Sequence, residues 1–400
     1  MALMLSDFDN CYIITDSIPG INTASIGLWL QNGARYESLN EQGYAHFLEH
    51  LVFKQTKQHS GAQLSTLFEV MGGHINAETG REMTAFHGLV PQQHAVELLS
   101  LFIEMLFQTD FSQSDFKIER DVVLQELAML KDDPEEALED FGSEQVWLNH
   151  NIGRQILGSR ASLNNASFVG MHEYLKTVTR NKKLCIVATG NVDHDSICAA
   201  CESIPAPKSP IMPNISIPEY SQSNRHLDIL AEQKHLLWIM PAVSYNDDLQ
   251  PAFEIANHII AGGYDSRLYQ VLREQLGLVY SVDSRVDHYS DTGLWFIQTN
   301  TENQNLTDTI TAIENTMSDL ISHGPTEKEI ESAALHLQSS MIIARDDLEA
   351  RMDKLARDII YTGKIQSLED QLDALKKVTR DDIQFIIKQA WSSVSHYTAG

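Results

Sequence analysis

A cluster of prolines near the middle of the chain constrains the fold more than any other feature. Five of the eleven prolines lie between Pro205 and Pro218, in the segment SIPAPKSPIMPNISIPEY. Proline lacks a backbone N–H donor and restricts the residue before it, so neither a helix nor a central strand can run through this segment. We therefore expect a linker at residues 205–222, which joins an N-terminal domain (residues 1–204) to a C-terminal domain (residues 223–400).

The two halves resemble each other in the order of their predicted elements. Each opens with a β-rich segment, Ser25–Trp29 in the first half and His235–Met240 in the second, and continues through a polar loop into a helical segment. Further strand patterns lie at Cys11–Thr15, Met83–Val90, Leu184–Ala188, Leu227–Ala231, Gly277–Ser284 and Gly293–Thr299. Helices and strands mix without a strict βαβ alternation, which predicts the α+β class, with antiparallel or mixed sheets backed by helices.

An alignment of the halves on Trp29 and Trp238 also aligns the helices that follow. With a shift of one residue, the alignment pairs His50 with His258, Glu49 with Asn257 and His46 with Glu254. If the halves arose by duplication, the second half therefore lacks the same chemistry.

Charge and hydropathy exclude several classes of function. The net charge of −26 repels phosphate backbones, so we expect no nucleic-acid partner. No stretch approaches the roughly 18 apolar residues of a membrane span. The first basic residue is Arg35, so the start of the chain does not resemble a signal peptide, and we expect a cytoplasmic protein.

The four cysteines are too few for a disulfide framework, and we interpret the lone C-x-x-C at Cys198 and Cys201 as part of an apolar helix face.

The helical segment GYAHFLEHLVF, residues 43–53, carries the residues best suited to chemistry. His46 and His50 are four apart, so both imidazoles lie on one helix face and can reach one small cation. Glu49 lies beside His50 and can take a proton from a water at that cation. The alternative interpretation is a polar helix face with two hydrogen-bonded histidines.

A third metal ligand has to come from elsewhere in the chain. The predicted helix at residues 112–130 offers Glu119 and Glu126, which are seven apart and so share a face, and Ser112 with Asp115 predicts a capping box at its start. The alternative for both glutamates is a solvated position on the helix surface.

With these residues in place, the chain resembles the pitrilysin family of metallopeptidases, peptidase family M16 or the inverzincins, and within it the small two-domain bacterial or processing-peptidase-like type. The family pattern is H-x-x-E-H followed by a glutamate about 76 residues further on, and Glu126 is 76 residues after His50. The resemblance implies that His46, His50 and Glu126 bind one Zn²⁺ per chain and that Glu49 is the general base. Glu119 matches a family glutamate that supports the site without binding metal.

The resemblance extends to segments that handle substrate. NAETGREMTAF, residues 76–86, is similar to a family strand to which substrate adds as an extra strand, which implies substrate-binding roles for Asn76, Ala77 and Thr79. Arg273 and Tyr280 are seven apart, as in relatives, where they contact substrate and help to polarise the scissile carbonyl. The chain departs from the family at Gln55, usually a glycine, and in a glycine-rich loop reduced to Gly262–Gly263, so substrate preference stays open.

The resemblance implies two homologous α/β-roll domains, each a mostly antiparallel sheet backed by helices, the first catalytic and the second inactive. We expect a zinc endopeptidase that cleaves peptides, or processes small polypeptides, inside a chamber formed by a homodimer or by a heterodimer with a related subunit. The alternative is a non-catalytic or partner-dependent subunit of a heterodimeric processing peptidase, which binds peptides or acts as a scaffold. Such subunits usually lose part of the H-x-x-E-H set, whereas this chain retains all of it.

Overall fold

The computed structural model describes residues 2–180, 183–207 and 216–400, which form two compact units. The first unit comprises Met1–Ala128, Arg154–Ser216 and Ala344–Ile365, and the second comprises Met129–Gly153, Ile217–Ile343 and Gln366–Gly400. Of the linker predicted at residues 205–222, residues 208–215 lie outside the described residues, so the linker stays a prediction. No helix among the described residues is long and apolar enough to cross a membrane.

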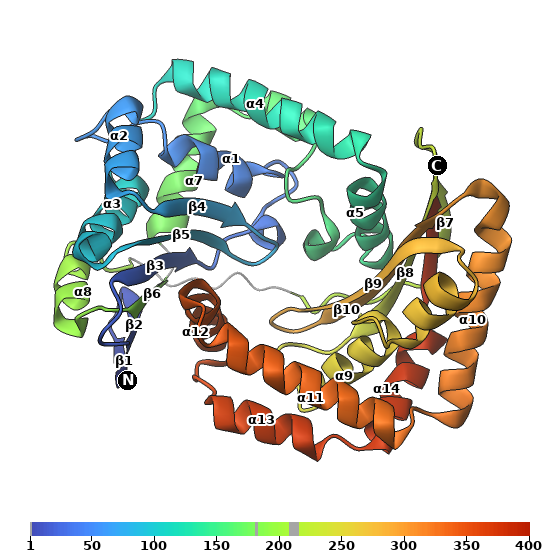
Figure 1. Ribbon diagram of the computed structural model, residues 1–400. Helices are drawn as coiled ribbons and strands as arrows, with labels where there is room; N and C mark the ends of the chain where they lie inside the picture. The colour runs from blue at the N-terminus through green and yellow to red at the C-terminus, as the bar shows by residue number, and fades with distance from the viewer. Residues whose placement is uncertain (1, 181–182, 208–215) are drawn as a thin grey trace. The chain divides into compact units, whose positions relative to one another are not determined.

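The first unit is built on a sheet in which the described strands follow the order β1-β2-β6-β3-β5-β4 (Figure 1). Neighbouring strands are antiparallel except for the parallel pair of β2 and β6. The strands are β1 (Ala2–Asp7), β2 (Cys11–Ser17), β3 (Thr23–Leu30), β4 (His74–Thr79), β5 (Thr84–Pro91) and β6 (Leu184–Gly190). The helices are α1 (Tyr44–Val52), α2 (Gly61–Met71), α3 (Ala95–Phe107), α4 (Gln113–Asp132), α6 (Arg160–Asn165), α7 (Phe168–Arg180), α8 (His194–Cys201) and α12 (Leu348–Thr362).

Both faces of this sheet are covered, as the alternation of side chains along β3 shows. Ile26 and Leu28 point into the main core, which α1, α3, α4 and α7 complete. Trp29 points the other way and packs against Met352 and Ile359 of α12. Successive side chains of a strand point to opposite faces, and every residue of β3 after Thr23 is buried, so the strand is covered on both sides.

The second unit repeats this plan. Its described strands follow the order β7-β11-β8-β10-β9, with one parallel pair, β7 and β11. The strands are β7 (Asn224–Leu227), β8 (Lys234–Ala242), β9 (Val279–His288), β10 (Gly293–Thr301) and β11 (Ser395–Ala399). The helices are α5 (Pro134–Val146), α9 (Gln250–Ala261), α10 (Leu306–His323), α11 (Glu327–Ala344), α13 (Leu368–Lys377) and α14 (Arg380–Ser392), with a π-helical turn at Tyr269–Gln275.

The two sheets confirm the predicted fold class of two mostly antiparallel sheets backed by helices. The order β2-β6-β3-β5-β4 of the first unit matches β7-β11-β8-β10-β9 of the second, and the parallel pair falls at the same place in both. Trp29 lies on β3 and Trp238 on the matching β8, which agrees with the predicted duplication. One predicted strand is misplaced, because β7 ends at Leu227, where the predicted run Leu227–Ala231 begins.

The compact units do not follow the two halves of the sequence. Helix α5 precedes α6 in the chain yet packs against β8 and β11 of the second unit. Helix α12 comes from the last part of the chain and packs against β3 and β6 of the first unit. Each unit therefore contains a helix from the other half of the chain, which covers an otherwise exposed apolar face of its sheet.

A buried ion pair attaches α12 to the first sheet and gives a testable prediction. Arg351 of α12 pairs with Asp16 of β2, and both residues are buried. We expect Arg351→Ala to lower the free energy of unfolding by about 3–5 kcal/mol, because it leaves a buried carboxylate without its partner. Urea unfolding of the full chain, followed by tryptophan fluorescence, measures the change.

Arg357→Ala is the matched control on the same helix. Arg357 pairs with Asp353, and both side chains are about two-fifths exposed, at 40% and 39%. Its removal should cost less than about 1 kcal/mol, since exposed pairs contribute little. Equal losses in the two variants would contradict the proposed role of the buried pair.

Candidate metal centre

Helix α1 begins where the local sequence satisfies its first amides. The carboxylate of Glu37 accepts hydrogen bonds from the backbone N–H of Gly43 (2.8 Å) and of Ala45 (2.7 Å). These amides have no partner within the helix, so the buried carboxyl group, whose pKa burial raises to about 8, caps its start by accepting their hydrogen bonds. Gly43 adopts a left-handed conformation with φ of 85°, and a Cβ there would lie 2.5 Å from the carbonyl oxygen of Leu157, so glycine is required.

The helix then separates an apolar face from a polar one. Phe47 and Leu51 are fully buried in the core of the first unit. His46, Glu49 and His50 lie on the other face and are only partly buried. A helix with this pattern has one stable orientation on the core, and that orientation presents the three polar side chains together.

Helix α4 supplies the two glutamates that the sequence singled out. Its predicted capping box is confirmed, because Ser112 Oγ accepts from the backbone N–H of Asp115 (3.1 Å) and the Asp115 carboxylate accepts from the N–H of Ser112 (2.8 Å). Phe116, Val123 and Leu127 pack into the core, which turns Glu119 and Glu126 toward α1. The solvated alternative is wrong for Glu119, whose side chain is 5% exposed.

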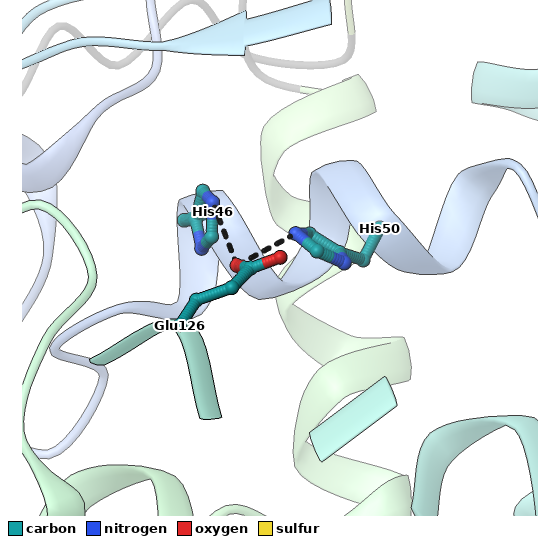
Figure 2. A group of neighbouring side chains, drawn as sticks. All are labelled: His46, His50 and Glu126. Carbon is teal, nitrogen blue, oxygen red and sulfur yellow. Dashed lines mark ion pairs between the residues drawn. The ribbon is translucent and has the colours of Figure 1, made fainter. Parts of the chain in front are cut away.

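His46, His50 and Glu126 converge on one point, as Figure 2 shows. Oε2 of Glu126 lies 3.8 Å from Nε2 of His46 and 3.4 Å from Nε2 of His50. One ligand atom from each residue lies within 4.8 Å of the others, and within the described part of the chain these three residues alone form such a group. Two imidazole nitrogens and one carboxylate oxygen are typical ligands of a catalytic zinc site, which keeps a fourth position open for water.

The electrostatics of His46 fit a metal ion. Burial is the main cause that lowers its pKa to about 4, and the neighbouring His50 contributes to the same shift. The imidazole is therefore neutral near pH 7, as metal binding requires. Its Nδ1 is buried without a hydrogen-bond partner among the described residues.

Glu49 is close to the three ligands but outside the group that they form. Burial raises the pKa of its carboxyl group, and a hydrogen bond from the hydroxyl of Thr79 to Oε2 acts in the opposite direction. A carboxylate with a raised pKa is a better proton acceptor near neutral pH than a solvated one. The Thr79 hydroxyl also limits the directions in which the carboxylate can point.

Glu119 contacts His50 at the ring nitrogen that does not face Glu126, and Lys54 in turn contacts Glu119. Oε2 of Glu119 lies 3.2 Å from Nδ1 of His50. Oε1 of the same carboxylate lies 2.7 Å from Nζ of Lys54, just beyond the end of α1. The sequence predicted Glu119 from its spacing and from family resemblance, whereas no pattern in the sequence indicated the contact with Lys54.

The strand predicted to bind substrate is the edge strand β4. It pairs with β5 and, among the described strands, with no other, so its outer backbone groups face away from the sheet. Asn76 and Ala77 lie in the middle of β4 and Thr79 at its end. The bond between Thr79 and Glu49 therefore links this edge to the metal centre, a link that the sequence did not reveal.

Arg273 and Tyr280 belong to the second unit. The guanidinium of Arg273 lies over the ring of Tyr280, 5.3 Å from its centroid. Tyr280 is 79% exposed, so it does not pack in the core of this unit. Its hydroxyl is accessible to a ligand.

The helix of the second unit that corresponds to α1 lacks a comparable site. His258 of α9 stacks on His336, with ring centroids 4.3 Å apart. Asn257, at the position that corresponds to Glu49, accepts hydrogen bonds from Ser284 and from the indole of Trp295. This amide takes part in packing, as predicted for a half without the first half's chemistry.

Comparisons with known proteins agree with this architecture. Residues 12–160 match the family model described as insulinase, peptidase family M16, and residues 170–337 match that described as peptidase M16 inactive domain. The match to a solved peptidase M16 inactive domain from Pseudomonas fluorescens covers 100% of this chain and 98% of that chain, with a TM-score of 0.92 and 17% sequence identity. The match to a solved protease from Helicobacter pylori covers 100% of this chain and 99% of that chain, with a TM-score of 0.90 and 15% sequence identity. These structures establish the fold.

Relatives with similar sequences cover nearly the whole chain. An uncharacterized zinc protease from Streptomyces coelicolor is 28% identical over 386 residues, which are 94% of this chain and 84% of that protein. The uncharacterized zinc protease YmxG of Bacillus subtilis is 27% identical over 386 residues, 95% of this chain and 93% of that protein. With both family models matched in order, the chain belongs to peptidase family M16, the pitrilysin family.

Proposed function

We propose that the protein is a zinc-dependent endopeptidase. The observation that carries the proposal is the convergence of His46, His50 and Glu126 within 4.8 Å of one another, with the partly buried carboxylate of Glu49 on the same face of α1 as the two histidines. Two of the similar proteins are named zinc proteases, which supports the same metal and the same class of reaction.

The donor atoms fit one zinc ion per chain. His46 is neutral, His50 has its Nδ1 turned toward Glu119, and the carboxylate of Glu126 faces both Nε2 atoms. When bound, zinc supplies Lewis-acid chemistry, because it lowers the pKa of a water ligand and polarises the carbonyl of the peptide bond.

Glu49 carries out the proton transfers. Its carboxylate takes a proton from the attacking water and later gives it to the leaving amine. Thr79 holds the carboxylate in place by its hydrogen bond to Oε2. A proton acceptor that is already oriented loses little entropy during the reaction, so this bond contributes to rate rather than to substrate affinity.

The edge of β4 holds the substrate as an added strand. The backbone of Asn76 and Ala77 pairs with an extended peptide, so main-chain hydrogen bonds supply the affinity. Because Thr79 ends this strand and contacts Glu49, a peptide paired with β4 runs toward the metal centre. Binding through the backbone needs no free terminus, which favours cleavage within a chain.

The proposal includes a cytoplasmic dimer, with a second copy or with a related subunit, in which Arg273 and Tyr280 help to polarise the scissile carbonyl. Its support is the family resemblance and the exposed Tyr280 hydroxyl. A non-catalytic peptide-binding or scaffolding subunit is the less favoured function, because the ligands, Glu49 and Glu119 are all present in a fitting arrangement.

Glu49→Gln separates catalysis from metal binding. We expect this variant to keep about one zinc per chain. Its turnover number should fall about 100- to 10,000-fold, because the amide cannot accept the proton. Metal analysis and cleavage of a mixed peptide library, with and without a chelator, measure both properties on the same samples. Cleavage at the wild-type rate would show that Glu49 is not the base.

His50→Ala tests the ligand set. We expect the variant to lose stoichiometric zinc, because two ligands cannot hold the ion as three do. His323→Ala is the control, since its side chain is 75% exposed and lies in the second unit. Metal analysis after dialysis against a weak chelator distinguishes them, and stoichiometric zinc in both variants would exclude His50 as a ligand.

Thr79→Val tests the link between the substrate strand and the base. The change removes the hydroxyl and keeps the shape of the side chain, so we expect kcat to fall about 10- to 100-fold with KM nearly unchanged. Thr79→Ser should restore most of the rate. A rise in KM at constant kcat would instead assign Thr79 to substrate binding alone.

A further inference from the structure

Lys54 begins a chain of contacts that ends at a metal ligand. Its Nζ lies 2.7 Å from Oε1 of Glu119. The other oxygen of that carboxylate, Oε2, lies 3.2 Å from Nδ1 of His50. Nε2 of the same imidazole faces Glu126 at 3.4 Å. An ammonium, a carboxylate and an imidazole are thus arranged in sequence behind the metal centre.

The ammonium decides how Glu119 interacts with His50. The side chain of Glu119 is 5% exposed, and a buried carboxylate is costly unless charged or hydrogen-bonding partners compensate for the lost water. With Lys54 on one oxygen, the carboxylate acts as an acceptor, so Nδ1 of His50 has to donate. That tautomer leaves the lone pair of Nε2 free for a metal ion.

We propose that Lys54 is a positioning residue of the metal centre, which fixes the carboxylate of Glu119 and through it the orientation and tautomer of His50. This inference rests on the proposed function, because it assumes that His46, His50 and Glu126 bind zinc. It assigns to Lys54 an effect on zinc affinity although the lysine contacts no ligand directly.

The competing interpretation is a surface ion pair without consequence for the metal. The side chain of Lys54 is 37% exposed, and pairs with an exposed member often contribute little to stability. The two interpretations predict different effects of Lys54 on zinc affinity, and the positioning effect requires Glu119. If Lys54 acts through this carboxylate, its removal has no further effect once the carboxylate has been replaced.

A double-mutant cycle on the full chain tests this dependence. The four proteins are the wild type, Lys54→Met, Glu119→Gln and the double variant, and the measured quantity is the zinc dissociation constant from competition with a colorimetric chelator. We expect each single substitution to raise the dissociation constant about 10- to 100-fold, as losses of outer-shell partners do. The double variant should bind zinc about as tightly as Glu119→Gln alone.

Two further variants and one measurement separate positioning from folding. Lys54→Arg keeps a cation within reach and should retain most of the affinity, whereas Lys57→Met removes an exposed lysine three residues further on and should change nothing. The metal-free Lys54→Met protein should unfold within a few degrees of the wild type, while the rise in its Tm at a fixed zinc concentration should be smaller.

Each remaining outcome overturns the inference. An unchanged dissociation constant for Lys54→Met, or a loss that adds in full to that of Glu119→Gln, would show that Lys54 does not act through the carboxylate. If the wild type binds zinc and Lys54→Met does so equally well, the proposed function stands and only the role of Lys54 falls. A wild type that binds no zinc under metal-replete conditions would remove both.

Discussion

The contact between helices α1 and α4 is the interaction on which the metal centre depends. Phe47 of α1 and Phe116 of α4 are both buried, with ring centroids 5.1 Å apart. Aromatic pairs of this kind bury a large apolar area and prefer a narrow range of geometries, so they hold two helices in a defined register. The polar faces of the helices then meet at a fixed place, which brings Glu126 to the two histidines although the ligands lie far apart in the sequence. The site is therefore a consequence of core packing, and the polar contacts refine it.

Polar residues around α1 complete the arrangement at both ends of the helix. Glu37 binds the first amides, and the pair of Glu119 with Lys54 holds His50 near the last turn. Both glutamates are buried, so each has to be satisfied by specific partners, and those partners exist only when α1 lies in its native position.

The duplicated plan shows how one architecture supports chemistry in one copy and packing in the other. The matching helices α1 and α9 both lie against the sheet of their own unit, and each carries a histidine at the corresponding position. In α1 the neighbouring side chain is that of Glu49, which shares the polar face with His46 and His50. In α9 Asn257 bonds to a serine and a tryptophan, and His258 stacks on another histidine. Fold and function are separable, because a helix face can exchange its polar residues without changing its apolar contacts.

Features that depend on local pattern can be predicted from the amino-acid sequence. Helical periodicity places His46 and His50 on one face, and extended periodicity predicts the strands around Trp29 and Trp238. A short-range motif predicts the capping box at Ser112. The structure contains all of these features. Helix spacing offered Glu119 and Glu126 as candidates, and family resemblance assigned their roles. Three features are visible only in the folded chain: α5 and α12 pack on the sheet of the other half of the sequence, Thr79 contacts Glu49, and Lys54 contacts Glu119. The physical reason is that a pattern of apolar and polar residues shows which face of an element is buried, whereas the partner of that face is chosen by packing between segments that are distant in the chain.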